Sequence, residues 1–217
     1  MTVVIVMTAV ILADVKGETM AKSEPRPRER MVFSAAQLIR RHGVSATGLR
    51  DVVAHARAPR GSVQHYFPEG KQQLVGEAVE WAGRYAGGWV PRLLAGMAAP
   101  TPSKLFAAMV RQWIEEYRRD GFAAGCPLAA TTVDWVESTP EIRPSLTRAL
   151  AAWRDPVVAA LVELGVPRRK ATGMATLMIS TLEGAVVLAR VEQDLDPLYT
   201  AVRELGPHLD TYVAVRE

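Results

Sequence analysis

TGLRDVVAHARAPRGSVQHYFPEGK, residues Thr47 to Lys71, is the most informative segment of this chain. It predicts two short helices joined by a tight turn, followed by a glycine-containing corner that opens a longer helix. Pro59 suits the first turn of the second helix, because its missing N–H costs nothing there. That helix contains five polar or aromatic residues within seven positions, namely Arg60, Ser62, Gln64, His65 and Tyr66. Such a helix in a basic segment predicts a DNA-contacting element.

The neighbouring residues complete a three-helix unit. A first helix is predicted over residues 28–42, because four apolar residues fall on one helical face: Val32, Ala35, Ala36 and Ile39. Gly43 is expected to end it. Thr47 is expected to cap the helix that follows it. Val63 and Phe67, four residues apart, are expected to anchor the next helix, which begins near Pro59. Three helices of this length enclose a small core.

Positive charge is concentrated in this part of the chain. The 217 residues have a net charge of +3, but residues 22–75 contain ten Lys or Arg against four Asp or Glu. Residues 76–217 contain fifteen against seventeen. Duplex DNA attracts such a basic segment through counterion release. A solvated basic face would show the same asymmetry, so charge alone leaves both interpretations open.

Composition indicates a globular protein without catalytic signatures. A hydrophobic content of 49% allows a buried core, and the length fits one large domain or one small and one medium domain. One cysteine, Cys126, excludes an intrachain disulfide and a cysteine-based zinc site, which fits the reducing cytoplasm where we expect the protein. The histidines lack metal-ligand spacing, and no phosphate loop or nucleophile elbow is present. We therefore expect no enzymatic activity, no metal and no cofactor.

The first residues differ from the rest. Thr2–Val15 is apolar and β-branched, but it is shorter than the roughly 20 residues that a membrane helix needs. The first basic residue, Lys16, follows this apolar run, whereas in a signal peptide it precedes the run. We expect residues 1–25 to form an N-terminal arm. Within it, we interpret residues 1–19 as a translation start assigned too early, with Met20 as the physiological start. A short strand or helix packed on a partner is the alternative, and we expect no membrane association.

The remainder of the sequence predicts helices only. Lys71 opens a long helix to about Ala95. Glycine and proline breaks separate five further helices, over about 103–119, 127–135, 140–164, 168–190 and 197–215. Alternation with period two is confined to residues 2–12. The fold class is therefore predicted to be all-α, without internal repeats.

A longer segment resembles the N-terminal part of the TetR family of bacterial transcription regulators: ERMVFSAAQLIRRHGVSATGLRDVVAHARAPRGSVQHYFPEGKQQLV. The APRGS corner, the extra residue in HYFPEGK, the later GCPLA and the EGAVVLAR run before Asp194 are most similar to the LmrA/YxaF-type subgroup. The resemblance implies a helix-turn-helix DNA-binding domain over residues 26–70 and a helical effector-binding and dimerisation domain over residues 71–217. It implies a ligand-responsive repressor that releases a palindromic operator when a small, aromatic or hydrophobic effector binds.

The resemblance also implies which residues contact DNA. Thr47 corresponds to a phosphate-contacting helix cap, and Lys71 to a lysine that meets a phosphate at the start of the fourth helix. The recognition helix contributes Arg60, Gly61, Ser62, Gln64, His65 and Tyr66. Arg pairs with guanine and Gln with adenine, each contributing about 1–3 kcal/mol of discrimination. Ser, Tyr, Thr and Lys are typical phosphate partners, and Gly61 either permits close backbone approach or is a tolerated small residue.

Two residues depart from the pattern that the resemblance implies. Gln64 stands where the family usually has tyrosine, so the base preference is expected to differ. Arg57 stands where the family usually has glycine. If that position requires a positive φ, arginine costs about 1 kcal/mol there. A relaxed turn and a phosphate contact by Arg57 are the alternatives.

Large aromatic and thioether side chains in the C-terminal part are candidates for lining an effector cavity, because they give extensive apolar contact. They are Trp81, Trp89, Met109, Trp113, Tyr117, Trp135 and Met178. For each of them, a filled core is the competing interpretation. Glu183, within an apolar stripe, is expected to anchor a cationic or hydroxylated ligand or to pair with an arginine at a dimer seam. Cys126 is interpreted as structural rather than as an oxidant sensor.

The last two helices are expected to form the surface of a homodimer. Small residues there would let two helices approach closely: Ala175, Ser180, Gly184, Ala185 and Ala189. A two-fold dimer would place its recognition helices about 34–36 Å apart in successive major grooves of operator DNA. An activator of the same fold, or a regulator controlled by a protein partner, is the alternative function.

Overall fold

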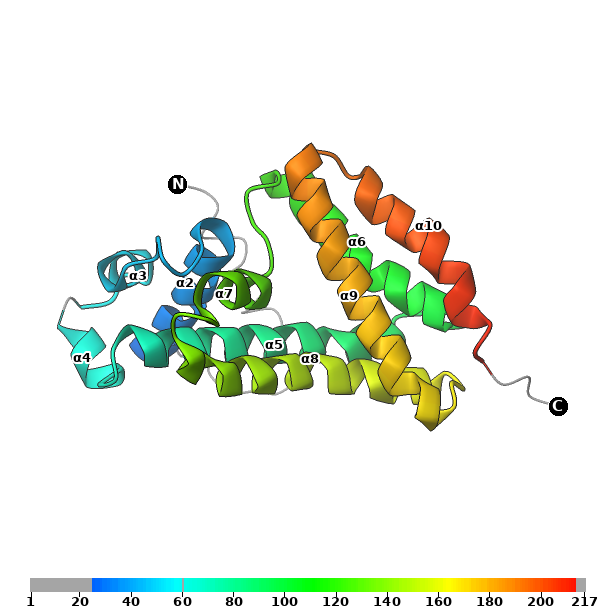
Figure 1. The fold of residues 1–217 in the computed structure, drawn as a ribbon, viewed down its shortest axis with the longest axis horizontal. Coiled ribbons are helices and arrows are strands. Elements are labelled where there is room, and N and C mark those ends of the chain that lie inside the picture. Colours follow the sequence, from blue (N-terminus) through cyan, green and yellow to red (C-terminus); the bar gives the residue numbers. More distant parts are fainter. Residues whose placement is uncertain (1–24, 60, 214–217) are drawn as a thin grey trace.

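Helix α5 (Lys71–Ala95) is the central element of the fold. The structure is a computed structural model that describes residues 25–59 and 61–213. The predictions for residues 1–19 and for Arg60 therefore lie outside the described residues. Figure 1 shows α5 running from the N-terminal helices at one end of the molecule to the C-terminal helices at the other. The described residues form helices and no strand, which confirms the predicted all-α class.

Three helices pack around the first half of α5. They are α2 (Pro27–His42), α3 (Leu49–His55) and the short α4 (Ser62–Tyr66). Their shared core buries the apolar face predicted for the first helix, together with Phe67, which is 0% exposed, and Leu74 of α5. Ile142, far along the sequence, completes this core. The predicted domain boundary at residue 70 thus falls between α4 and α5, although α5 contributes to the same core as the N-terminal helices.

The start of α3 differs from the prediction. The helix begins at Leu49 with Gly48 before it, so the prediction that Thr47 caps it is wrong. The Asp51 carboxylate accepts a hydrogen bond from the Gly48 N–H at 3.1 Å. Thr47 is buried, and its hydroxyl donates to the Gly43 carbonyl at 2.7 Å. The hydroxyl therefore stabilises the preceding turn instead of the helix.

The remaining helices form the larger C-terminal part. They are α6 (Pro102–Asp120), α7 (Pro127–Trp135), the 3-10 turn η1 (Pro140–Ile142), α8 (Arg143–Glu163), α9 (Arg168–Glu192) and α10 (Asp196–Asp210). Figure 1 shows α8 alongside α5, with α6, α9 and α10 grouped at the far end. The last helix ends at Asp210, short of the predicted residue 215, and residues 211–213 form a turn and bend.

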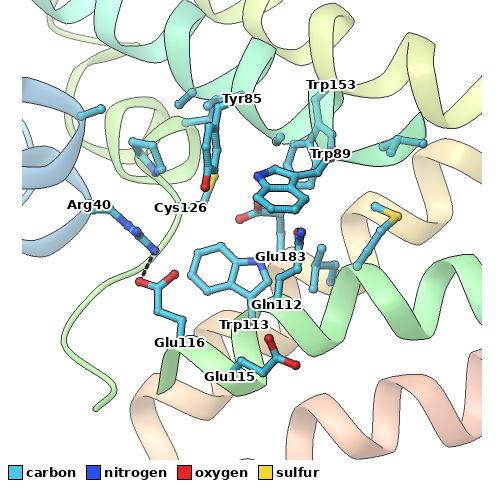
Figure 2. A pocket seen from close by; sticks show the side chains of 18 of the residues that line it. Arg40, Tyr85, Trp89, Gln112, Trp113, Glu115, Glu116, Cys126, Trp153 and Glu183 are labelled. Carbon is cyan, nitrogen blue, oxygen red and sulfur yellow. Dashed lines mark ion pairs between the residues drawn. The ribbon is translucent and has the colours of Figure 1, made fainter. Parts of the chain in front are cut away.

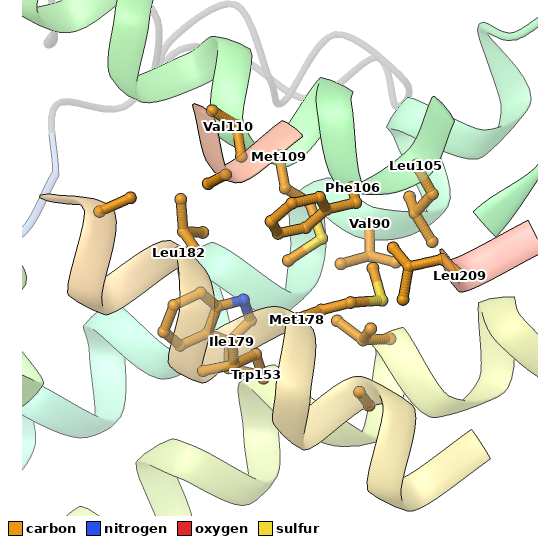
Figure 3. Close-up of a cluster of buried hydrophobic side chains, with 14 of the residues drawn as sticks. Val90, Leu105, Phe106, Met109, Val110, Trp153, Met178, Ile179, Leu182 and Leu209 are labelled. Atoms are coloured by element: carbon orange, nitrogen blue, oxygen red, sulfur yellow. The ribbon is translucent and has the colours of Figure 1, made fainter. Parts of the chain in front are cut away.

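A second core joins α5, α6, α8, α9 and α10. Figure 3 shows Phe106 and Met109 of α6 meeting Trp153 of α8 and Met178 of α9. Met178 is completely buried. By length and composition α9 is apolar enough to cross a membrane, but its inner face belongs to this core. The core helix of a soluble protein passes the same test, and 44% of the apolar window of α9 is buried inside the structure.

Candidate DNA interface and ligand cavity

Helix α4 presents its polar side chains outward. Val63 is half-buried and Phe67 fully buried, so the inner side of the helix is fixed to the N-terminal core. Gln64 and His65 are exposed, whereas Ser62 and Tyr66 are half-buried. The Ser62 hydroxyl donates to the Pro59 carbonyl at 2.6 Å, which ties the helix start to the preceding turn. This arrangement leaves side chains of the types that contact bases on the open face of the helix.

Gly61 shows no internal reason for being glycine. Its φ is −82°, a conformation open to any residue, and a Cβ placed there meets no atom within 4 Å. Gly70 differs, because its φ of +71° favours glycine at the turn before α5. The open space at Gly61 is compatible with close approach of an external backbone.

Lys71 lies at the first turn of α5 and is half-buried. Its ammonium lies 5.4 Å from the centroid of the Trp135 ring. Burial lowers the pKa of Lys71, and the nearby Asp134 carboxylate opposes that change. Asp134 also accepts from the backbone N–H of Val44 at 2.7 Å, which holds α7 against the turn between α2 and α3. The predicted phosphate-contacting lysine is therefore positioned by a residue pair from α7.

A cavity of about 530 Å³ lies where α2, α5, α6, α7, α8 and α9 meet. This volume is typical of sites for drug-sized ligands. Its aromatic walls come from three helices and contain Trp81, Tyr85, Trp89, Trp113 and Trp153. Figure 2 shows Trp89, Trp113 and Glu183 grouped around the cavity. An apolar ligand of several rings would find stacking surfaces on more than one side.

Three of these rings form a row along α5. Trp81 stacks on Tyr85 with centroids 5.1 Å apart, and Tyr85 meets the edge of Trp89 at 6.2 Å. Phe33 of α2 extends the row, because its ring lies 5.3 Å from Trp81. The four-residue spacing places successive side chains on one face of the helix. The row therefore runs from the cavity to the N-terminal core.

The cavity contains some of the residues predicted to bind a ligand and not others. Trp81, Trp89, Met109, Trp113 and Glu183 line it. Tyr117 does not, because it is buried and its hydroxyl donates to the Ala124 carbonyl at 3.1 Å. Trp135 packs on the N-terminal core, and Met178 is enclosed in the second core. These three pack as the competing interpretation of a filled core describes, and their contact with a ligand stays a prediction.

Sequence reasoning missed several residues of the wall. Tyr85 could have been found, because it lies midway between two predicted tryptophans at helical spacing. Trp153 and Gln112 had no comparable signal, because their contribution depends on how α6 and α8 cross α5. Arg40 and Cys126 also line the cavity. Arg40 was not identifiable, since it belongs to α2, outside the segment in which we expected an effector site.

Arg40 joins α2 to the C-terminal helices. Its guanidinium lies 2.7 Å from the Glu116 carboxylate of α6 and 5.2 Å from the Trp113 ring centroid. Its Nε donates to the Gly125 carbonyl at 3.0 Å, and the Gly125 N–H donates to the Arg40 carbonyl at 2.8 Å. Arg190 of α9 holds the other side of this loop through the Phe122 carbonyl. The loop from residue 121 to residue 126 therefore connects α2 with α6 and α9.

Comparison with known proteins gives the same arrangement. Residues 34–78 match the model of the bacterial regulatory proteins of the TetR family, and residues 102–204 match the LmrA/YxaF-like C-terminal domain of transcriptional regulators. An HTH-type transcriptional regulator of Mycobacterium tuberculosis is 40% identical over 184 residues, covering 82% of this chain and 92% of its own. The chain belongs to the TetR family. It is a DNA-binding transcription regulator of that family and not an enzyme.

More distant TetR family relatives agree with this assignment. YxaF of Bacillus subtilis is 25% identical over 179 residues, covering 82% of this chain and 92% of its own. The crystal structure of a regulatory protein TetR from Rhodobacter sphaeroides superposes with a TM-score of 0.71 at 22% identity, covering 84% of this chain and 98% of that one. This structural likeness extends the shared fold to nearly the whole of that regulator.

Proposed function

We propose that this TetR family member is a cytoplasmic, homodimeric repressor that releases a palindromic operator when a small apolar effector occupies the cavity. The observation that carries the proposal is the composition of the cavity wall. Arg40 and Gln37 of α2 line it together with the aromatic row of α5. An occupant therefore touches both helices that hold the DNA-contacting unit in place.

The DNA-contacting part of the proposal rests on α4 and the start of α5. Gln64 and His65 supply exposed groups for base edges, and Lys71 and Tyr66 supply groups for phosphates. Arg60 remains a sequence-based prediction for guanine contact. Thr47 also remains a predicted phosphate contact, although its burial and its bond to Gly43 leave its hydroxyl little freedom to reach one.

The dimer part of the proposal rests on the outer face of α9. Exposed residues follow one another at alternating steps of three and four: Leu177, Ser180, Gly184, Val187 and Val191. This is the spacing of a seam between two packed helices, and Leu188 widens its apolar strip. Of the predicted small residues, Ser180 and Gly184 lie on this face. Ala175, Ala185 and Ala189 do not, because they are buried inside the subunit.

Release of DNA is proposed to follow from a change in the contacts of Arg40. An effector between α5 and α6 would have to displace Trp113 or the Arg40–Glu116 pair to fill the cavity. Either change alters how α2 rests on the loop at Gly125. The separation of the two recognition helices in the dimer would then no longer match successive major grooves. An effector achieves this only through its higher affinity for the released state.

Operator selection followed by binding measurements tests the proposal. DNA bound by the purified protein is expected to yield a palindrome, and Gln64→Ala should weaken binding to it by about 10-fold while leaving scrambled DNA nearly unaffected. Lys71→Ala should weaken both alike and lower the salt dependence by about one unit. Fluorescence anisotropy on both duplexes measures these effects.

Two outcomes would contradict the proposal. Equal losses for both variants on both duplexes would refute the division between base and phosphate contacts. A reporter gene under the selected operator whose expression falls when the protein is removed would show an activator instead of a repressor.

A further inference from the structure

Glu183 lines the effector cavity, and its carboxyl group has no charged partner among the described residues. Both carboxylate oxygens are shielded from water, and neither has a hydrogen-bond partner among the described residues. Figure 2 shows Glu183 between the rings of Trp89 and Trp113 in that view. Glu183 lines the cavity, whereas Gly184 and Val187 of the same helix are exposed, so the ligand-anchoring interpretation is the one developed below. Its position requires an explanation, because an isolated buried carboxylate is costly.

The surroundings of Glu183 do not supply a compensating charge. Burial raises the pKa of Glu183 to about 7, and the approach of the Cys126 thiol only partly opposes the rise. The other titratable or charged groups of the wall are Arg40 from α2, Tyr85 from α5, Arg111, Glu115, Glu116 and Arg119 from α6, and Cys126 before α7. Arg40 is already paired with Glu116 and Arg119 with Asp120, and Arg111 is exposed to solvent. The carboxyl group is thus available to an incoming ligand.

We propose that the effector is an apolar organic cation, whose positive charge is held by the Glu183 carboxylate and whose rings lie against the tryptophans of α5, α6 and α8. This inference rests on the proposed effector-responsive function and names its ligand class. A ligand hydroxyl would bond to one oxygen but would not neutralise the charge of the ionised carboxylate. A cation neutralises that charge, and the faces of tryptophan and tyrosine attract cations.

The aromatic wall has more rings than its own arginines cover. The Arg92 guanidinium lies 5.4 Å from the Trp89 ring centroid and that of Arg40 lies 5.2 Å from the Trp113 centroid, so these two rings already have a cation near them. Tyr85 and Trp153 add rings from α5 and α8. A cavity of about 530 Å³ accommodates two or three fused or linked rings. The ligand would therefore carry its charge close to Glu183 and its rings along the α5 row.

Binding of a permanent cation would be coupled to one proton. The carboxyl group of Glu183 is partly protonated near neutral pH in the empty cavity. It must lose that proton to solvent before it can neutralise the cation. Cation affinity should therefore be full above pH 7 and should fall about 10-fold for each unit below it.

Three probes of similar shape but different charge separate the contribution of charge to binding from that of shape. N-methyl-4-phenylpyridinium is a permanent cation, 4-methylbiphenyl is its neutral counterpart, and biphenyl-4-carboxylate is an anion of similar outline. Equilibrium dialysis of the full-length protein at pH 8 measures their affinities. We expect the cation to bind at least 10-fold more tightly than the neutral compound, and the anion to bind most weakly.

Glu183→Gln tests the residue itself, because it keeps the shape and removes the charge. It should lower cation affinity at least 10-fold, leave 4-methylbiphenyl within twofold, and abolish the pH dependence between pH 6 and 8. Glu163→Gln removes an exposed carboxylate of α8 outside the cavity and serves as the control. It should change none of the three affinities.

The inference is overturned if Glu183→Gln lowers the affinity for the cation and the neutral compound equally, or if the anion binds most tightly. It is also overturned if none of the three probes binds. Release of the operator by the neutral compound, unaffected by Glu183→Gln, would overturn the cation preference while leaving the effector-responsive function intact. Loss of operator binding itself is measured separately and would concern only the proposed function.

Discussion

Glu183 occupies an environment that opposes the charge of its side chain. Its ordinary pKa of 4.5 rises to about 7 because the folded chain removes the carboxyl group from water. As pH rises, Glu183 loses its proton near pH 4.5 in the unfolded chain but only near pH 7 in the folded chain. Ionisation of Glu183 therefore favours the unfolded state, and the resulting loss of stability is complete only above pH 7.

This linkage gives a prediction at the scale of one residue. Below about pH 4.5 the wild-type protein and Glu183→Gln should be equally stable, and above pH 7 the variant should be more stable by about 3 kcal/mol. Urea unfolding at pH 5 and pH 8, at one protein concentration, measures the difference. Glu163→Gln, as an exposed control, should stay within about 0.5 kcal/mol of wild type. The same advantage for Glu183→Gln at both pH values would contradict the assignment.

Arg57 is a residue whose unusual backbone conformation could be predicted from the sequence. The resemblance singled it out because glycine is usual at its position, and the structure gives it a φ of +50°. The alternative of a relaxed turn is therefore wrong. The left-handed conformation costs a non-glycine residue about 1 kcal/mol. Its side chain is exposed, and its contact with a phosphate stays a prediction.

Helices α5 and α8 pack almost backbone to backbone. A Cβ added at Gly83 would collide with the Ala149 carbonyl, and one added at Gly87 with the Ala152 carbonyl. Both glycines are buried, whereas the neighbouring Gly88 is exposed and has open space around it. Close approach of α8 places Trp153 beside the row of rings on α5. The glycines of α5 thereby determine the width of the cavity.

Adjacent glycines provide a prediction at the scale of this helix pair. Gly87→Ala should destabilise the protein by about 1–3 kcal/mol, because α8 has to move away from α5. Gly88→Ala should stabilise it by up to about 1 kcal/mol, because alanine is the better helix former. Thermal and urea unfolding measure both. Equal effects of the two substitutions would mean that α5 and α8 are not in close backbone contact.

At the scale of the whole molecule, two cores share helix α5. The N-terminal core contains Leu74 and Ala78 from its first half, and the C-terminal core contains Val90 from its second. The cavity lies between these regions, and Arg40 crosses from one to the other. A ligand at this position contacts both cores at once. In the proposed function, an occupied cavity therefore acts on α2 and α5 together.

The outer face of α9 leads to a prediction about assembly. Val187→Asp places a charge in the middle of the proposed seam and should convert dimers to monomers at micromolar concentration. Operator affinity should fall by at least about 100-fold, because the two half-sites are no longer linked. Sedimentation and anisotropy measure the two effects. Val133→Asp, at a valine of α7 that is 86% exposed and outside the seam, should leave both unchanged. A dimeric Val187→Asp protein would place the interface elsewhere.

The sequence by itself determined the helices and the class of protein. Helical spacing of apolar residues, together with glycine and proline breaks, was enough to place α2, α5, α6 and α9 within a few residues of their observed bounds. Helix α4 was predictable as a short helix because its residue types and their order are local properties, and its contact with DNA stays a prediction. The cap of α3 was not, since Thr47 turns to Gly43 in a turn whose geometry the pattern does not describe.

Only the tertiary structure decided which large side chains form a cavity and which fill a core. Trp113 and Trp135 are alike in sequence terms, yet one lines the cavity and the other packs under Lys71. Arg40 could not be assigned to the cavity at all, because its partners Glu116 and Gly125 are more than seventy residues away. Periodicity shows which face of a helix is apolar. It does not show which part of that face meets another helix, and the shape of the cavity depends on how several helices cross.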